Sequence, residues 1–507
     1  MEEPHVLELD VNHYTVAAFF VYLITIVIIG VLSSRFSSKG IGHYFIGGRQ
    51  MNKLVVALSA VVSGRSIWIM LGFVGIAFEM GASAIWAAAG YTIIEFFLFW
   101  FYARRLRRFS EQYKCITIPD FFDYRFNDKS GFLRILTVAV ITLFMVIYVS
   151  SQFVGGGKAF AAGFQMSMEM GIILTAIIVA AYTILGGFLA VSLTDSVQAI
   201  FMILALVGLP IVAVFTEGGW TVISETLRQL DPSLLDPTAL GLGAFLGLVG
   251  IGLGSPGNPQ ILARYMSISD TEQLKFSAVT GTITNVLLAV GALFTGLIAR
   301  MHFGEVGALP GEDPENAFPL IAQHYLHPIL FGAVLASIFA AIMSSADSQL
   351  LVGASGIVRD IYEKHIYRGQ TIDQKHLVFL SRAIVLVLVI IALIMGFFAE
   401  QVVFWLVLFA WGGLGASIGP TSILALFWKR TTLPGVASGF ITGTVVVFVW
   451  EHYKESLASV IGFELYELIP AFLLSMLMTV VVSLVTKPPE DTEEKFKSMK
   501  QPKGKNH

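Results

Sequence analysis

Apolar runs of about 20 residues recur along the whole chain, and short polar loops separate them. A helix of that length crosses the hydrocarbon core of a bilayer, because each residue adds about 1.5 Å. We therefore expect an all-α polytopic membrane protein. The pattern predicts about 13 transmembrane helices, at residues 13–34, 53–78, 83–103, 132–160, 169–186, 193–216, 240–262, 276–300, 328–353, 378–398, 402–428, 434–452 and 466–486.

Two of these runs are interrupted near the middle. The second contains Ser63-Gly64-Arg65-Ser66, and the seventh contains Gly254-Ser255-Pro256-Gly257. Glycine and proline disfavour a continuous helix, so we expect a break in each run. Paired interrupted helices at corresponding positions are typical of transporters built from inverted repeats. The alternative is that these residues only permit a kink or close helix packing.

The two breaks divide the chain into repeats. Each break lies in the first helix of a five-helix set, which places the first inverted repeat at 53–216 and the second at 240–430. The remaining segments are an N-terminus, extra first helix and loop at 1–52, a loop at 217–239, two C-terminal helices at 431–486 and a tail at 487–507. The tail is polar, and we expect it to be disordered.

Charged side chains are few, 13% of the chain, and the basic ones lie in alternate loops. Basic loops at 35–53, 104–125, 359–375 and 429–430 alternate with acidic or neutral ones such as 217–239. Basic loops remain in the cytoplasm, so the pattern predicts a cell-membrane protein with its N-terminus outside and its C-terminal tail inside. No stretch is left over for a soluble catalytic domain.

The sequence lacks the motifs of other functional classes. It contains no nucleophile–base pair, metal-ligand spacing or nucleotide loop, and Gly155-Gly156-Gly157-Lys158 lies inside a predicted span without the spacing of a phosphate loop. We therefore expect neither an enzyme nor an organic cofactor. The absence of a long basic tract argues against a nucleic-acid partner, and the single cysteine, Cys115, excludes an intrachain disulfide.

A polar stretch, Met343–Gln349, lies within the ninth apolar run. On a helix Ser344, Asp347 and Ser348 share one face, with Ser345 beside them. An ionised carboxylate inside a membrane costs at least about 2.5–3.5 kcal/mol, so it needs a compensating partner. Hydroxyl and carboxylate oxygens suit a small, hard cation. The alternative is that the serines bond to backbone carbonyls while the aspartate pairs with a basic side chain elsewhere.

Several segments resemble motifs of the sodium/solute symporter family, nearest its sodium/proline branch. The similar segments are Tyr44–Arg49, Thr117–Phe126, Gly186–Gln198, Ala263–Met266, Trp411–Gly415 with Gly419-Pro420, and Phe427–Arg430. They occur in the family's order and span nearly the whole chain. The resemblance implies a LeuT-like fold of five-plus-five inverted repeats preceded by one extra helix.

The resemblance also implies binding sites. One sodium ion would lie between the first broken helix and the helix that carries Met343–Gln349. Its ligands would be the Ser344 and Ser345 hydroxyls with the backbone carbonyls of Val62 and Arg65. Some members bind a second sodium, whose ligand positions match Asp195, Ser344, Asp347 and Ser348. The solute would lie near Trp68, Tyr148, Gln152 and the seventh-span break at Ser255, with Arg65 as a further candidate.

Four positions depart from the family pattern. The proline branch has an aspartate where this chain has Gly64, and members often have a hydroxyl where this chain has Asp347. The aromatic residues of the branch's pocket are replaced here by Ile251 and Ser255, so a proline pocket cannot be transferred. Gly64 is followed directly by Arg65, whose guanidinium is always charged.

Arg65 has three alternative interpretations. It could pair with Asp347 or Asp195, hold a substrate carboxylate, or occupy the space of a sodium ion. Asp195 in turn is either a cation ligand or a plain partner of Arg65 or Lys158. Glu95, also inside a span, is either a proton carrier or locally paired.

We therefore expect a sodium-coupled symporter that imports a small polar solute, a proline-like amino acid or an organic carboxylate, by alternating access. One or two sodium ions would be used. A monomer in the bilayer suffices for this mechanism, and an oligomer is compatible with it. The alternatives are a proton-coupled or cation-independent carrier in which Arg65 replaces sodium, and a solute sensor that does not transport.

Overall fold

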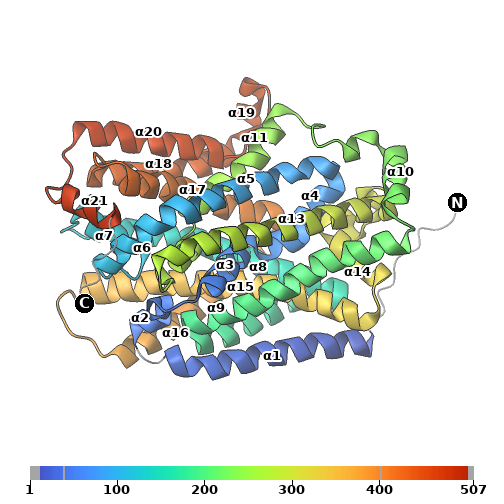
Figure 1. Ribbon diagram of the computed structural model, residues 1–507, viewed down its shortest axis with the longest axis horizontal. Helices are drawn as coiled ribbons and strands as arrows, with labels where there is room; N and C mark the ends of the chain where they lie inside the picture. Colours follow the sequence, from blue (N-terminus) through green and yellow to red (C-terminus); the bar gives the residue numbers. More distant parts are fainter. Residues whose placement is uncertain (1–11, 38–39, 400–401, 501–507) are drawn as a thin grey trace.

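The computed structural model describes residues 12–37, 40–399 and 402–500, and most of them are helical. The only β-pairing within these residues is one isolated bridge between Met51 and Ile268. Most long helices run along the long axis of the molecule (Figure 1). The all-α fold class is therefore confirmed. Short helices α6, α7 and α21 lie at one end of the molecule, and α10 lies at the other. The basic loop at 104–125 and the acidic loop at 217–239 are therefore at opposite ends.

The helices occupy the ranges that the sequence predicts for two repeats, and the bounds of these repeats remain a prediction. The chain begins with α1 (His13–Ser37) and α2 (Ile41–Ile46). The first repeat contains α3 (Lys53–Ile67), the π-helical turn η2 (Trp68–Gly72), α4 (Phe73–Met80), α5 (Ile85–Phe97), η4 (Leu98–Tyr102), α6 (Ala103–Gln112), α7 (Ile118–Phe126), α8 (Phe132–Phe164) and α9 (Met168–Thr216). Gly187, with φ 71°, divides α9 into two parts, because only glycine adopts this conformation without strain.

The second repeat follows the loop that contains α10 (Trp220–Leu230). It comprises α11 (Leu242–Gly250), the 3₁₀ segment η6 (Ile251–Gly257), α12 (Pro259–Ser267), α13 (Leu274–Phe303), η10 (Pro314–Asn316), α14 (Ala317–Tyr325), α15 (Pro328–Ser355), η11 (Gly356–Ile366), α16 (Gln374–Phe397) and α17 (Val403–Phe427). The chain ends with α18 (Leu433–His452), α19 (Lys454–Ile461), α20 (Leu468–Val485) and α21 (Thr492–Lys500).

Ten helical segments of the described chain are long and apolar enough to cross a membrane. Two shorter apolar segments, Met168–Ile184 and Leu242–Gly257, accompany them. The segment Lys53–Gln112 is continuous in this count, although the sequence predicts two spans within it. A polytopic membrane protein is confirmed, whereas the number of about 13 spans remains a prediction.

Both predicted helix breaks are present. In α3 the break lies at Ser66, whose φ of 50° and ψ of −165° are far from helical values. The second break is η6, where the helix tightens before Asn258 and resumes at Pro259. Glycine lets α17 approach η6 closely, since a Cβ on Gly257 would lie 2.3 Å from the Leu414 carbonyl oxygen. Each break exposes backbone groups to side chains of neighbouring helices.

The tail departs from the prediction. Residues 492–500 form α21, which packs against α6, so the expectation of disorder is wrong for this part. Phe496 and Met499, three residues apart on one helical face, are buried. Lys495 Nζ donates to Asn127 Oδ1 at 2.7 Å and pairs with Asp491 at 2.8 Å. A short apolar face and these polar contacts anchor the helix. Residues 501–507 lie outside the described part.

Candidate cation and solute sites

The first candidate site is a group of buried polar side chains that we call the serine–aspartate cluster. Its members are Ser59, Ser63, Asp195, Arg264, Ser344, Ser345, Asp347 and Ser348. Asp195 Oδ2 is its centre and accepts hydrogen bonds from Ser59 Oγ at 2.5 Å, Ser63 Oγ at 3.3 Å and Arg264 Nη2 at 3.0 Å. The cluster joins α3 and α12 on one side to α9 and α15 on the other.

Direct hydrogen bonds connect α15 to the last turn of α3 before its break. Ser345 Oγ lies 3.4 Å from the Val62 carbonyl oxygen and 3.2 Å from that of Ser63. In the opposite direction Ser63 Oγ donates to the Ser344 carbonyl at 3.1 Å. The structure therefore brings together Val62, Ser344 and Ser345, three of the predicted sodium ligands. The Arg65 carbonyl instead accepts a hydrogen bond from the backbone N–H of Trp68.

The serine–aspartate cluster contains more negative than positive charge. Asp195 pairs with the guanidinium of Arg264, which also donates to Ser348 Oγ at 2.5 Å. Asp347 Oδ1 accepts a hydrogen bond from the same Ser348 hydroxyl at 3.2 Å. Both carboxylates are fully buried, and Asp195 Oδ1 and Asp347 Oδ2 have no hydrogen-bond partner within the described chain. A buried charge without a partner is costly, so this arrangement favours an added monovalent cation. The hydroxyl, carbonyl and carboxylate oxygens are the ligands that hard cations prefer.

A small cavity of about 20 Å³ lies between this cluster and α7. Arg264 and Ser348 line one part of it, and Thr117 and Pro119 line another. Because α7 belongs to a basic loop, the cavity connects the cluster with the side predicted to face the cytoplasm.

The second candidate site is centred on Glu95, and we call it the Arg65–Glu95 cluster. It consists of Arg65, Tyr91, Glu95, Ser255 and Asn285. Glu95 forms a buried ion pair with Arg65, and it also accepts from Ser255 Oγ at 3.1 Å and Asn285 Nδ2 at 2.8 Å. The Arg65 guanidinium lies 3.7 Å from the centre of the Tyr91 ring. The Glu95 carboxylate, on α5, thus contacts α13 and both of the broken helices.

Two ion pairs differ from those considered on sequence grounds. Arg65 pairs with Glu95 rather than with Asp347 or Asp195, and Asp195 pairs with Arg264. Arg65 therefore turns away from the serine–aspartate cluster, although Ser63 of that cluster is only two positions away in sequence.

Lys158 pairs with Asp313 and Glu315 of the loop before α14, at 2.5 Å each, and not with Asp195. Glu315 also accepts hydrogen bonds from the backbone N–H groups of Val403 and Phe404 at the start of α17. Burial raises the pKa of the Glu315 carboxyl above its ordinary value, and Lys158 opposes this shift. This contact joins α8, the loop and α17 at the end opposite α7.

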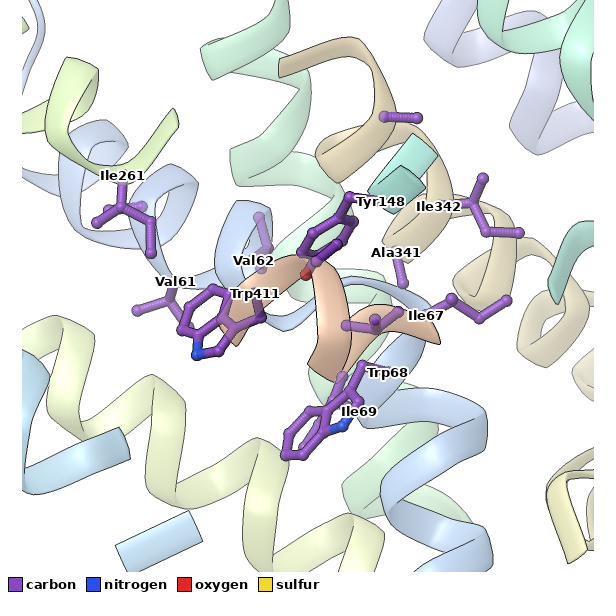
Figure 2. Packing of buried hydrophobic residues seen from close by; sticks show 14 of the residues in the cluster. Val61, Val62, Ile67, Trp68, Ile69, Tyr148, Ile261, Ala341, Ile342 and Trp411 are labelled. Atoms are coloured by element: carbon purple, nitrogen blue, oxygen red, sulfur yellow. The ribbon is translucent and has the colours of Figure 1, made fainter. Parts of the chain in front are cut away.

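The other predicted solute residues surround the break in α3. Gln152 Oε1 accepts the backbone N–H of Ile67 at 3.3 Å, and the Tyr148 hydroxyl donates to Ser66 Oγ at 3.3 Å. Trp68 stacks on Phe404 with ring centres 5.7 Å apart. Figure 2 shows the rings of Trp68 and Tyr148 on either side of Ile67, the residue after this break. Sequence reasoning thus selected residues that lie around one point.

Several members of these clusters are not among the residues that the sequence predicts. Ser59 and Ser63 lie four residues apart, a spacing that places two hydroxyls on one helix face. Arg264 lies just beyond the second break and could have been considered as the partner that a buried Asp195 requires. No local pattern identifies Tyr91 or Asn285, because their roles depend on helix packing.

Comparison with known proteins agrees with this geometry. The family model of the sodium:solute symporter family matches residues 44–443. The chain belongs to the sodium:solute symporter family. Sodium/proline symporters of Staphylococcus aureus, strains JH9 and NCTC 8325, are 36% identical over 493 residues, which cover 95% of this chain and 94% of theirs.

Two solved structures share the fold. A Na+-coupled sialic acid symporter in a substrate-bound outward-open state has a TM-score of 0.79 at 18% identity, covering 94% of this chain and 99% of that one. MHP1, a nucleobase-cation-symport-1 family transporter in a closed conformation, has a TM-score of 0.53 at 12% identity, covering 90% and 98%. The LeuT-like fold is thus confirmed. The protein is a multi-pass cell-membrane transporter that couples solute import to sodium, and it is not an enzyme.

Proposed function

We propose that the protein binds the coupling sodium ion in the serine–aspartate cluster and imports a small amino acid or organic carboxylate that binds beside the break in α3. The unbalanced negative charge of Asp195 and Asp347 against Arg264 is the observation that carries this proposal. Sodium supplies the missing positive charge. Val62, Ser344, Ser345 and Ser348 supply neutral oxygen ligands. The excess of one charge supports a single ion in this cluster.

Coupling follows from the position of the cluster. Sodium would be held jointly by oxygens of α3 and of α15, so its binding favours the arrangement in which these helices are close. The break in α3 carries Trp68 and lies beside Tyr148 and Gln152, hence sodium also orders the proposed solute site. By reciprocity, a solute that binds more tightly with sodium also tightens sodium binding by the same factor.

Transport would be inward, with the N-terminus outside and the α21 end in the cytoplasm. The basic loops near α6 and α7 and the acidic loop around α10 support this orientation. The cavity from Ser348 toward α7 offers a path for release of sodium on that side.

Uptake into proteoliposomes tests the proposal. Labelled L-proline is the first probe because the sodium/proline symporters are close relatives, and a mixture of labelled amino acids and organic acids is the second. We expect an inward sodium gradient to drive accumulation. Asp347→Asn should abolish the sodium dependence, and Ser345→Ala should shift uptake to higher sodium concentrations. Ser475→Ala, which alters a buried serine in α20, is the matched control. Sodium-independent uptake, unchanged in Ser345→Ala, would refute the proposal.

The same assay separates the proton-coupled alternative. If Asp347 Oδ2 takes a proton instead of neighbouring sodium, uptake will follow a pH gradient in sodium-free buffer and will be lost in Asp347→Asn. The position of Arg65 gives no support to direct replacement of sodium, because its guanidinium contacts Glu95 and Tyr91. A sensor that does not transport would bind the solute without accumulation.

A further inference from the structure

The Arg65–Glu95 cluster and the adjacent Trp68 retain unused hydrogen-bonding capacity. Arg65 Nε, Trp68 Nε1, the Tyr91 hydroxyl and Asn285 Oδ1 are buried and lack a partner among residues 12–37, 40–399 and 402–500. Buried polar groups in folded proteins are paired in about 90% of cases or more, so several orphans at one place call for an explanation.

These groups lie in contact with one another. Arg65 is stacked on the Tyr91 ring at 3.7 Å, and the Trp68 and Tyr91 rings have their centres 5.9 Å apart in an edge-to-face arrangement. Glu95 connects Arg65 to Asn285 through its two oxygens. They also adjoin both helix breaks, where inverted-repeat transporters bind their solutes. A ligand at this point could satisfy the orphans together.

The unpaired atoms fall into two groups, one of hydrogen-bond donors and one with an acceptor. Arg65 Nε and Trp68 Nε1 can only donate, and the Tyr91 hydroxyl can donate or accept. On the other side, Asn285 Oδ1 can only accept, and it lies beside the Glu95 carboxylate. The first group fits a carboxylate, and the second fits an ammonium group.

The charge balance of the cluster further limits the class of ligand that fits. Arg65 and Glu95 neutralise each other, unlike the side chains of the serine–aspartate cluster. A carboxylate without an amine would bring an unpaired negative charge into this buried place, and an amine alone would bring a positive one. A zwitterion leaves the site neutral and, unlike an uncharged solute, offers a charged partner to both groups of unpaired atoms.

We propose that the Arg65–Glu95 cluster, with Trp68, selects a zwitterionic solute. The carboxylate binds Arg65, Trp68 and Tyr91, and the ammonium group binds Glu95 and Asn285. This inference rests on the proposed solute site beside the α3 break and decides between its two solute classes in favour of amino acids. Tyr91, Glu95 and Asn285 thereby become specificity-determining residues.

Thermal-shift titrations of the purified full-length protein in sodium chloride test this selection. The probes are individual L-amino acids, the same molecules without the amino group, and the same molecules without the carboxylate. For proline the two analogues are tetrahydro-2-furoic acid and pyrrolidine. We expect at least one amino acid to stabilise the protein. Both of its analogues should bind about 100-fold more weakly or worse, because each loses charged hydrogen bonds.

Two variants assign the effect to this site. Glu95→Gln should weaken binding of the amino acid by about tenfold or more while it strengthens binding of the carboxylate analogue, since Arg65 is then unpaired. Tyr91→Phe, which keeps the ring, should weaken binding of the amino acid by several-fold and preserve folding. Tyr44→Phe is the control, because Tyr44 is also buried with an unpartnered hydroxyl but lies in α2.

Three results would overturn the inference. They are binding of the carboxylate analogue as tightly as the amino acid, an unchanged preference in Glu95→Gln, and no binding of any amino acid to folded protein. Failure of the sodium proposal has a different signature, in which amino acids bind selectively whether or not sodium is present.

Discussion

The serine–aspartate cluster and the Arg65–Glu95 cluster both include residues of α3 just before its break, and their charges differ. The first has two carboxylates and one guanidinium, whereas the second has one of each. The first spans the gap between α3 and α15, and the second joins the broken helices to α5 and α13. Charge imbalance creates a demand for a mobile cation, and charge balance creates a fixed polar surface for a neutral ligand.

The position of Arg65 in the sequence does not reveal to which of the two clusters it belongs. It adjoins Gly64, where the proline branch carries an acid, so a compensating charge near sodium was a reasonable interpretation. Residues two positions apart on a helix do not share a face, so Arg65 points away from Ser63 and reaches Glu95 on α5. In the proposed cation site this leaves Asp195 and Asp347 as the carboxylate ligands, and Arg264 pairs with Asp195.

Arg264→Met should produce the largest effect of any change in the two clusters. It leaves two carboxylates buried without a partner, and breaking a buried ion pair costs about 3–5 kcal/mol. We expect a strong decrease in the melting temperature and uptake reduced by more than about 100-fold, measured by scanning fluorimetry and in proteoliposomes. Arg368→Met, at an exposed position, is the control. Wild-type stability of Arg264→Met would refute the claim that this cluster is short of positive charge.

The Arg65–Glu95 pair should behave as a balanced unit. Arg65→Met and Glu95→Gln each leave one buried charge, so each should destabilise the protein by about 3 kcal/mol or more, whereas the double variant should recover much of this loss. Unfolding of all four proteins under identical conditions provides the double-mutant cycle. Additive effects of the two changes would contradict the pairing.

Ser345→Ala should have a more limited effect. It removes one neutral oxygen ligand and leaves every charge in place, so we expect the sodium concentration for half-maximal uptake to rise about tenfold with little change in stability. Ser475→Ala should leave this concentration unchanged. An equal increase in both variants would show that the effect is not specific to the cation site.

The smallest effect on transport is expected from α21, which contacts neither cluster. Phe496→Ala should lower stability by about 2–4 kcal/mol at most, because a buried ring is lost near the end of the chain, where local unfolding is tolerated. Sodium dependence of uptake should remain at the wild-type value. A changed sodium dependence would show that the tail helix communicates with the cation site.

The sequence predicted much of the architecture. Lengths of apolar runs identified the membrane helices, and Gly64–Ser66 and Gly254–Gly257 located the breaks, because both signals depend on local chemistry. The spacing of Ser344, Asp347 and Ser348 likewise identified the polar face of α15. These features need no knowledge of which helices become neighbours.

The partners of buried charges could not be predicted in this way. Arg65 with Glu95, Asp195 with Arg264 and Lys158 with Glu315 are separated in sequence and meet only after the helices pack. The tail was misjudged because its overall polarity concealed the apolar face of Phe496 and Met499. In both situations tertiary contacts outweigh composition.

Sodium binding by the purified protein tests the central claim most directly. The melting temperature is followed against sodium chloride, with choline chloride holding the ionic strength constant, for the wild type, Asp347→Asn and Glu95→Gln. We predict that wild type and Glu95→Gln are stabilised with similar midpoints and that Asp347→Asn shows no sodium effect. A normal sodium response in Asp347→Asn, together with its loss in Glu95→Gln, would place the cation in the Arg65–Glu95 cluster. It would contradict the claim that sodium binds in the serine–aspartate cluster.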